Sequence, residues 1–330
     1  MTSSSILVTG GAGYIGSHTV LALGAAGQPV VVLDNLSKGR RDLVPAGVPF
    51  YEGDVGNPEL LAQIAREHRI SAVVHFAGDI VVPESVAAPL TYYQNNTCKT
   101  RTLLQACVDH GIERFVFSST AAVYGEPDRV PVGEDAPTRP ASPYGTSKLM
   151  VEWMLRDAAL AHGLRYVALR YFNVAGADPQ GRTGQATPQA THLIKVACEV
   201  AAGKREGLQI YGDDYDTPDG TCVRDYIHVS DLARAHVSAL DYLAHSRDSL
   251  TLNCGYGRGY SVREVVEAVT RVFGRPIPVR QAGRRAGDVA SLVADASRLR
   301  RTLEWVPEHE ELDFILRTAL DWELSQVEAV

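Results

Sequence analysis

The feature that most constrains this chain is a run of glycines near its amino terminus. Residues 9–16 read TGGAGYIG, which has the spacing G-x-x-G-x-x-G. The run follows a short apolar strand pattern, Ile6–Thr9, and precedes a helical pattern, Tyr14–Ala26. Glycines between a strand and a helix let the backbone turn tightly and approach a pyrophosphate, whose charge is stabilised at the helix amino terminus. This context predicts a dinucleotide site in the first strand–helix unit.

Short apolar runs alternate with helical patterns through the first half of the chain. Nearly unbroken β-branched runs are typical of strands buried on both faces of a parallel sheet, and helices between them imply right-handed crossovers. The predicted strands are Ile6–Thr9, Val30–Asp34, Val73–Phe76, Arg114–Ser119 and Tyr166–Arg170, and the predicted helices are Tyr14–Ala26, Pro58–His68, Val86–His110 and Pro143–His162. The sequence therefore predicts an α/β protein with a doubly wound parallel sheet of the Rossmann type.

The pattern becomes less regular after Arg170. A stretch rich in Gly, Pro, Gln and Thr, Asn173–Gln189, predicts a loop. Beyond it we expect a helix from about Thr191, a strand over Leu208–Tyr211, a helix from Ser230, a strand over Thr251–Cys254 and a helix from Ser261. This mixture predicts a smaller α/β substrate-binding domain. We divide the chain into residues 1–175 and 176–330, and expect some elements of the second part to return to the first.

Composition and charge argue against several classes of binding partner. The 330 residues are 45% hydrophobic and carry a net charge of −7, so no general attraction to nucleic acid or anionic lipid is expected. No apolar run approaches the roughly 18–20 residues that span a bilayer, and no basic region precedes the first strand. The five cysteines lack a C-x-x-C spacing and the ten histidines lack a paired-ligand spacing. We expect a cytoplasmic protein without a metal site.

An acidic residue closes the second predicted strand. Asp34 can accept hydrogen bonds from the adenosine ribose hydroxyls and would repel a 2′-phosphate, which favours NAD over NADP. Three nearby cations, Lys38, Arg40 and Arg41, act in the opposite direction. Asp54, at the end of a third strand, is a further candidate for contact with the adenine.

A tyrosine and a lysine stand four residues apart at the start of a predicted helix. Tyr144 and Lys148 share one helix face because four residues make about one turn. An isolated tyrosine has a pKa of about 10, which a nearby ammonium or an oxidised nicotinamide lowers. Thr120 ends a predicted strand at the edge where open α/β sheets bind ligands, and its hydroxyl can relay a proton. The three residues predict removal of a proton from a sugar hydroxyl as hydride leaves.

These residues resemble the UDP-glucose (UDP-galactose) 4-epimerase family of the extended short-chain dehydrogenase/reductase superfamily. The similarity extends from about Ile6 to Trp305. It rests on TGGAGYIGSHT at 9–19, LDNLS at 33–37, HFAG at 75–78, YYQNNT at 92–97, SSTAAVYGE at 118–126, SPYGTSKLMVE at 142–152, LRYFNVAGADP at 169–179, YGDDYDTPDGTCVRDYIHV at 211–229 and RRAGD at 284–288. The resemblance implies epimerisation of UDP-hexoses through a transient 4-keto sugar with NAD retained. It also implies a homodimer formed by the Val86–His110 and Pro143–His162 helices.

The resemblance implies a role for each matching position, with Thr120, Tyr144 and Lys148 as the catalytic residues. The positions implied to surround NAD are Gly10, Gly13, Tyr14, Ile15, Gly16, Asp34, Asn35, Asp54, Val55, Phe76, Ala77, Gly78, Asn95, Lys148 and Phe172. Those implied to line the UDP-sugar site, besides Thr120 and Tyr144, are Asn173, His192, Leu193, Gln209, Tyr211, Arg224, Arg285, Asp288 and Leu292. Arg224 and Arg285 agree with the chemistry, because a diphosphate is bound well by forked cationic donors.

Four positions depart from the family pattern. Asp79-Ile80 replaces a pair that in many relatives ends in lysine, and Thr120 takes a position where serine is commoner. His192 stands where some relatives carry an asparagine that contacts the substrate. Leu292 stands where relatives confined to non-acetylated hexoses tend to have tyrosine, which implies a pocket that also takes N-acetylhexosamines.

Three other functions need part of the same set of residues. A 4-epimerase of a UDP-pentose or UDP-uronate uses the same residues, so the sequence leaves that alternative open. A nucleotide-sugar 4,6-dehydratase needs an additional acid and base after Thr120, where this chain has Ala121-Ala122. A non-catalytic NAD-binding protein needs neither Tyr144 nor Lys148, and both are present.

Overall fold

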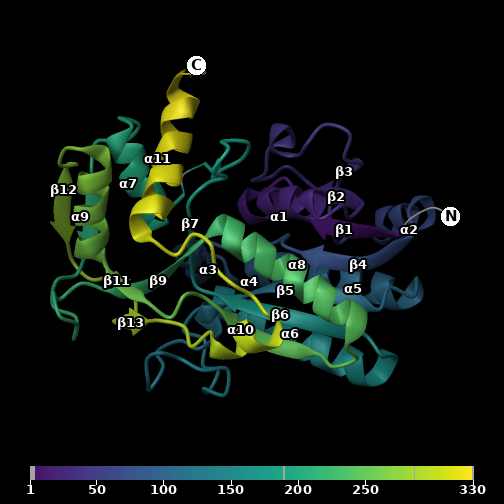
Figure 1. Cartoon of the computed structure of the whole chain (residues 1–330). Helices are drawn as coiled ribbons and strands as arrows, with labels where there is room; N and C mark the ends of the chain where they lie inside the picture. The colour runs from purple at the N-terminus through teal and green to yellow at the C-terminus, as the bar shows by residue number, and fades with distance from the viewer. Residues whose placement is uncertain (1–3, 189, 286, 329–330) are drawn as a thin grey trace.

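The large sheet of the molecule consists of seven parallel strands. We describe a computed structural model of residues 4–188, 190–285 and 287–328, so that Gln189 of the predicted loop and Ala286 of RRAGD lie outside the described residues. The strand order is β10-β6-β5-β4-β1-β2-β3 (Figure 1). The strands are β1 (Ser5–Thr9), β2 (Val30–Asp34), β3 (Phe50–Glu52), β4 (Ile70–His75), β5 (Arg114–Thr120), β6 (Arg165–Tyr171) and β10 (Leu250–Cys254). This sheet confirms the predicted doubly wound α/β fold.

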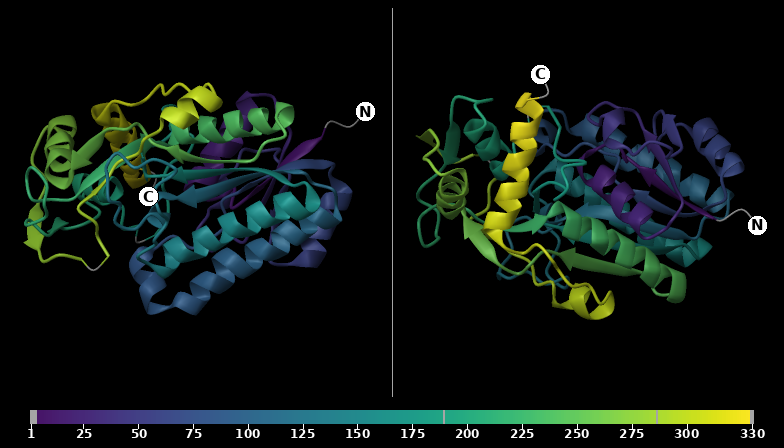
Figure 2. Two further views of the ribbon diagram at one scale, coloured as in Figure 1. Left: turned by 90° about the horizontal axis from the view of Figure 1, so that it is seen from below. Right: turned by 45° about the horizontal axis from the view of Figure 1, so that its top comes forward.

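Helices cover both faces of the large sheet, as Figure 2 shows. Successive strand residues point to opposite faces: Ile6 and Val8 belong to one apolar core, and Leu7 belongs to the other. One face carries α1 (Tyr14–Ala25), α8 (Val229–His245) and α10 (Ser297–Thr302), and the other carries α2 (Pro58–Glu67), α5 (Lys99–Asp109) and α6 (Pro143–His162). Burial on both faces explains why the strands read as unbroken apolar runs.

The single helix predicted over Val86–His110 is wrong. The chain instead forms α3 (Val82–Ala87), α4 (Pro89–Tyr92), the π-helical segment η2 (Tyr93–Cys98) and α5. Pro89 lies in the first turn of α4, where its missing N–H costs no helical hydrogen bond. Short 3₁₀ turns occur at η1 (Arg41–Leu43) and η3 (Ala121–Val123). Because π-helical turns are frequent at functional sites, η2 draws attention to its Asn95 and Asn96.

A second group of elements surrounds β9 (Val223–His228), which sequence reasoning missed. It pairs in parallel with β7 (Asn173–Ala175) and β13 (Ser291–Leu292) and antiparallel with β11 (Gly259–Ser261). A separate parallel pair consists of β8 (Leu208–Tyr211) and β12 (Val279–Ala282). Helices α7 (Leu193–Ala201), α9 (Val262–Phe273) and α11 (Leu312–Glu328) pack around one apolar core. Strand β7 corrects the loop predicted over Asn173–Gln189.

The two groups of elements are closely interleaved. Strand β10 comes from the second half of the chain but pairs with β6 in the large sheet, and α8 packs against α1. Strand β7 follows directly on β6 and begins the second group beside the carboxyl edge of the large sheet (Figure 1). Within the described ranges, no helix is both long and apolar enough to cross a membrane.

Candidate active site

The carboxyl edge of the large sheet gathers most of the predicted site residues. All neighbouring strands of this sheet run parallel, so the segments that leave β1, β2, β4, β5 and β6 emerge at one edge. Open α/β sheets bind ligands at this edge. The segments carry, in chain order, the glycine run, Asp34, Phe76, Thr120 and Phe172.

The glycine run forms a tight turn between β1 and α1. Gly10 has φ +71°, and a Cβ there would lie 2.7 Å from the backbone nitrogen of Ala77. A Cβ on Gly16 would lie 2.1 Å from the carbonyl oxygen of Gly10, so neither glycine tolerates a side chain. Gly13 precedes α1 without a side-chain cap, and the first turn of α1, which includes Ile15, holds no acidic residue. The helix amino terminus is therefore suited to the pyrophosphate of a dinucleotide.

Asp34 is buried beside this turn. One carboxylate oxygen accepts the backbone N–H of Ala12 at 2.9 Å, and the other accepts that of Leu36 at 2.8 Å. Burial raises the pKa of Asp34 overall, although these two hydrogen bonds act in the opposite direction. Because each carboxylate oxygen accepts about two hydrogen bonds, both retain capacity for ribose hydroxyls. The geometry fits the predicted role of Asp34 and its neighbour Asn35 toward NAD.

Two of the three cations near Asp34 have other partners. Arg40 forms an ion pair with Asp42, and the guanidinium of Arg41 lies 4.5 Å from the ring centre of Phe50. Their engagement weakens the case for a 2′-phosphate at this position.

Asp54 has two partners of its own. It accepts the ammonium of Lys99 at 2.6 Å and the backbone N–H of Gly56 at 2.7 Å. Burial opposes ionisation, but these partners lower the pKa of Asp54 overall. The adjacent Val55 is buried in the apolar core beneath the sheet. Contact of Asp54 and Val55 with the adenine stays a prediction.

The segment after β4 lies close to Asn96 of η2 and to Lys148 of α6. A Cβ on Gly78 would lie 2.8 Å from the side-chain oxygen of Asn96 and 3.7 Å from the ammonium nitrogen of Lys148. The side-chain amide of Asn95 donates to the carboxylate of Asp79 at 2.6 Å. Asp79, one of the departures from the family pattern, therefore holds a residue predicted to contact NAD. Sequence reasoning missed this partnership, although the position of Asp79 at the sheet edge is a signal for it.

Tyr144 lies in the first turn of α6. The hydroxyl of Ser142 accepts the backbone N–H of Gly145 at 3.2 Å and fixes where this helix begins. Tyr144 and Lys148 both lie in α6, four residues apart, and both are buried. Burial raises the pKa of Tyr144 overall, and the side chain of Thr120 acts in the opposite direction. The structure thus places Thr120 close to Tyr144.

Lys148 is held in an apolar setting. Its ammonium donates to the backbone carbonyl of Ser118 at 3.1 Å and lies 5.1 Å from the ring centre of Phe117. Burial lowers the pKa of Lys148 to about 8, and the charge of Asp79 acts in the opposite direction. Burial and the lysine charge lower the pKa of His75 to about 3, so this histidine adds no second cation. Lys148 is therefore a buried cationic group one helical turn after Tyr144 in α6.

A second cluster of predicted residues lies around Arg285. Its guanidinium binds both carboxylate oxygens of Asp288, at 2.9 and 3.2 Å, and lies 5.2 Å from the ring centre of Tyr211. The Tyr211 hydroxyl donates to the side chain of Gln209 at 2.6 Å. Burial opposes the charge of Arg285, but Asp288 raises its pKa overall, so the guanidinium remains charged.

Four further predicted residues meet around β9. Leu292 of β13 stands opposite Arg224 of β9, and Asn173 of β7 stands opposite Tyr226 of the same strand. Leu292 also packs against the apolar cluster that contains Phe172. Residues from both sides of the domain boundary predicted at 175 therefore converge here.

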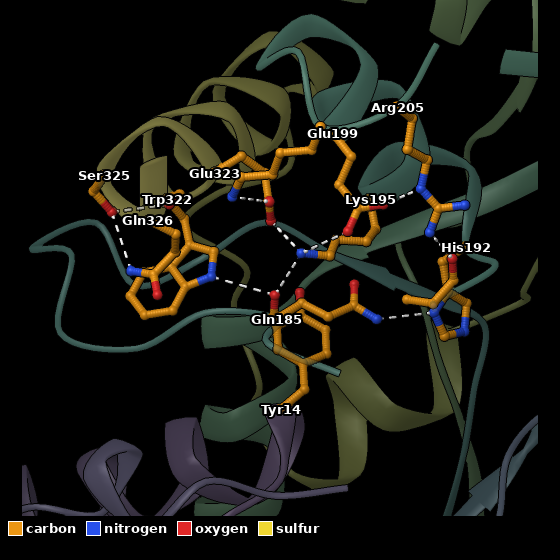
Figure 3. A network of polar contacts seen from close by, with 12 residues as sticks. Tyr14, Gln185, His192, Lys195, Glu199, Arg205, Trp322, Glu323, Ser325 and Gln326 are labelled. Atoms are coloured by element: carbon orange, nitrogen blue, oxygen red, sulfur yellow. Dashed lines mark hydrogen bonds and ion pairs between the residues drawn. The ribbon is translucent and has the colours of Figure 1, made fainter. Parts of the chain in front are cut away.

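His192 is tied to a residue that sequence reasoning missed. The side-chain amide of Gln185 donates to Nδ1 of His192 at 3.0 Å (Figure 3). Burial lowers the pKa of His192, and so does the charge of Arg285. The next residue, Leu193, begins α7. No local pattern signalled Gln185, because its importance comes from contacts that the fold creates. Within the described ranges, no cluster of metal-ligating side chains occurs.

Comparisons with known proteins agree on one family. Residues 6–255 match the model of the NAD dependent epimerase/dehydratase family. The chain is 63% identical over 328 residues to a UDP-glucose 4-epimerase of Azospirillum brasilense, covering 99% of this chain and 94% of the relative. The crystal structure of UDP-glucose 4-epimerase from Brucella ovis in complex with NAD is similar with a TM-score of 0.94 and 46% identity, covering 98% and 99% of the two chains. The UDP-Glc/GlcNAc 4-epimerase of Campylobacter jejuni is similar with a TM-score of 0.85 and 48% identity, covering 98% and 100%.

Proposed function

The chain belongs to the NAD-dependent epimerase/dehydratase family, and on this premise we propose that Thr120, Tyr144 and Lys148 carry the chemistry of NAD-dependent UDP-glucose 4-epimerisation. The observation that supports this assignment is that Thr120, at the end of β5, lies close enough to the buried Tyr144 of α6 to lower its pKa, at the sheet edge that also carries the glycine turn. Bound NAD would supply the hydride chemistry at C4 of the sugar, and the residues of this chain would hold the cofactor and the substrate for it.

The cofactor is held by the turns at the carboxyl edge of the sheet. The amino terminus of α1 stabilises the pyrophosphate, and the Asp34 carboxylate accepts the adenosine ribose hydroxyls. Lys148 lies beside Gly78, on the side of the site proposed for the nicotinamide ribose. The full set proposed to surround NAD is Gly10, Gly13, Tyr14, Ile15, Gly16, Asp34, Asn35, Asp54, Val55, Phe76, Ala77, Gly78, Asn95, Lys148 and Phe172.

Tyr144 moves the proton. As a phenolate it accepts the proton of the C4 hydroxyl, directly or through Thr120, and returns it when the sugar presents its other face. The phenolate is disfavoured by burial, so the buried ammonium of Lys148 must offset this cost. The apolar surroundings strengthen that attraction, because less water screens the two charges.

The sugar nucleotide is anchored at its diphosphate. Arg224 and Arg285 are proposed to bind the diphosphate oxygens, while the hexose is held loosely enough to turn over. The remaining residues proposed for this site are Asn173, His192, Leu193, Gln209, Tyr211, Asp288 and Leu292. Tight anchoring at one end and free rotation at the other are what transfer to both faces of C4 requires.

A single experiment tests the reaction. We expect the purified protein to contain NAD and to interconvert UDP-galactose and UDP-glucose without added cofactor. Liquid chromatography of the sugar nucleotides, together with NAD released on denaturation, measures both. Protein free of nicotinamide and inactive on either substrate would contradict the assignment.

Leu292 is proposed to widen the pocket toward N-acetylhexosamines. It lies opposite Arg224 and against the cluster of Phe172, where a larger side chain would fill space beside the sugar. We expect turnover of UDP-N-acetylgalactosamine, and we expect Leu292→Tyr to lower kcat/KM for that substrate roughly 10-fold or more, with a smaller effect on UDP-galactose. Absence of acetylated activity in the unmodified protein would refute this role.

We also propose that two copies associate through α3, α4 and α6. These adjacent helices expose large apolar side chains, with exposed fractions of 79% for Leu90, 63% for Val86 and 47% for Trp153. Sedimentation equilibrium should therefore give a dimer, which Leu90→Asp combined with Trp153→Asp dissociates. Val306→Asp, at a 73% exposed residue elsewhere, should leave the dimer intact. A monomeric parent protein would argue against this surface. The cytoplasmic location stays a prediction.

A further inference from the structure

We propose that Gln185 is a positioning residue that orients His192 toward the diphosphate of the UDP-sugar, and that the C-terminal helix holds Gln185 in place through buried ion pairs. The proposal rests on the placement of His192 and Arg285 at the UDP-sugar site given above. It concerns a part of the chain that supplies no residue to the chemical step.

The contact between Gln185 and His192 sets the state of the imidazole. Gln185 is buried, and its side-chain amide donates to Nδ1 of His192 at 3.0 Å. A histidine that accepts at Nδ1 and is neutral carries its proton on Nε2. The ring then presents its N–H donor on the side away from Gln185, and Arg285 lies close enough for its charge to lower the pKa of His192. That donor suits an anionic oxygen and supplements the arginine.

The backbone of Gln185 is fixed by an ammonium group. Its carbonyl accepts Lys195 at 2.8 Å and the indole N–H of Trp322 at 3.3 Å (Figure 3). The same ammonium pairs with Glu323 and lies 3.3 Å from a carboxylate oxygen of Glu199. Two hydrogen-bond acceptors and a further carboxylate surround the ammonium, so it has little freedom to move. The Gln185 carbonyl is therefore held between α7 and α11.

A second cation fixes the chain just before His192. Arg205 donates to the carbonyl of Ala190 at 3.0 Å and pairs with Glu199. Glu199 thus engages both Lys195 and Arg205, which hold opposite ends of residues 185–190. Buried ion pairs are often no more stabilising than apolar packing of the same volume. A role in orienting His192 explains why several charged side chains contact this short segment.

The beginning of the segment that leads to His192 contacts α1, the helix that follows the glycine turn. The hydroxyl of Tyr14 donates to the carbonyl of Gly176 at 2.6 Å, and the hydroxyls of Ser17 and Thr183 lie 2.7 Å apart. Tyr14 is the first residue of α1, directly after the glycine turn. The segment that begins at Gly176 therefore leads from α1 to His192. The contacts of Gln185 with Lys195 and Trp322 fix this segment shortly before His192.

A double-mutant cycle on KM tests the proposal. We expect Gln185→Ala to raise KM for UDP-galactose roughly 3- to 10-fold and to change kcat by less than about twofold. His192→Ala is expected to raise KM roughly 10-fold or more, and the double variant should match His192→Ala alone. Multiplying effects in the double variant would overturn the proposal alone. An unchanged KM in His192→Ala would overturn both the proposal and the assignment of His192 to the substrate site.

The contribution of the C-terminal helix has its own test. Glu323→Gln removes the negative charge that holds Lys195, so we expect KM to rise roughly 3-fold with NAD content and kcat unchanged, and no further rise when His192 is alanine. Asp321→Asn makes the same change at an exposed residue of α11 and should leave KM unchanged. Equal effects of the two variants, or a rise in KM that persists in the His192→Ala background, would overturn this part. Gln185→Ala keeps the proposal testable should Glu323→Gln fold poorly.

Discussion

Tyr144→Phe is expected to lower kcat by roughly 10²- to 10⁴-fold, the range that a positioned general base contributes. The substitution removes only the hydroxyl of a buried ring, so the packing of α6 is retained. NAD should remain bound, because the glycine turn and Asp34 are untouched. Turnover of UDP-galactose, NAD content and melting temperature measure the three parts of this expectation. Activity within about tenfold of the unmodified protein would show that another group accepts the proton.

Tyr124→Phe provides a matched control. Tyr124 is as buried as Tyr144, and its hydroxyl donates to Asn253 at 2.7 Å and accepts from Arg170 at 2.9 Å. Removing that hydroxyl should lower the free energy of unfolding by about 1–3 kcal/mol, because a buried partner is left unsatisfied. We expect kcat to stay close to that of the unmodified protein. The pair of variants separates loss of a buried hydroxyl from loss of the base.

The sheet edge and the candidate catalytic residues could be placed from the sequence because they depend on local signals. Short apolar runs that end near Thr9, Asp34 and Thr120 mark the ends of three strands. Parallel pairing then brings those ends together without further information. The spacing of Tyr144 and Lys148 likewise follows from the helical repeat alone.

Contacts between distant segments could not be predicted in the same way. The sheet around β9 joins strands that begin at residues 173, 223, 259 and 291, and no periodicity relates their registers. The single helix expected over Val86–His110 is wrong because Pro89 and the π-helical segment η2 interrupt it, although the apolar pattern continues. The ion pair of Lys195 with Glu323 spans 128 residues, so neither partner is marked as buried by its neighbours in sequence. Such contacts build the region where we propose that the UDP-sugar binds.

Lys148→Met is expected to lower kcat/KM by roughly 10- to 10³-fold, because an adjacent cation changes the pKa of an acid by about 1–3 units and thus the fraction of phenolate. Methionine fills a similar volume and adds no charge. The buried ammonium binds its proton less tightly in the folded protein than in the unfolded chain. Its loss should therefore not lower the melting temperature near neutral pH. Reduced turnover in a stably folded protein is the expected result, measured with UDP-galactose and by thermal unfolding. A fully active variant would refute the electrostatic role.

The pH dependence of kcat/KM tests the same electrostatic role of Lys148. The lysine pKa is lowered from 10.5 to about 8, so kcat/KM of the unmodified protein should fall as the pH rises through about 8 and the ammonium is lost. Between these two pKa values the unfolded chain binds more protons at this group, so its contribution to the free energy of unfolding rises with pH. Lys148→Arg keeps a cation at all these pH values and should abolish the alkaline fall, even where its geometry lowers the maximum rate. An alkaline limb that persists unchanged in Lys148→Arg would assign the titration to a group other than the lysine.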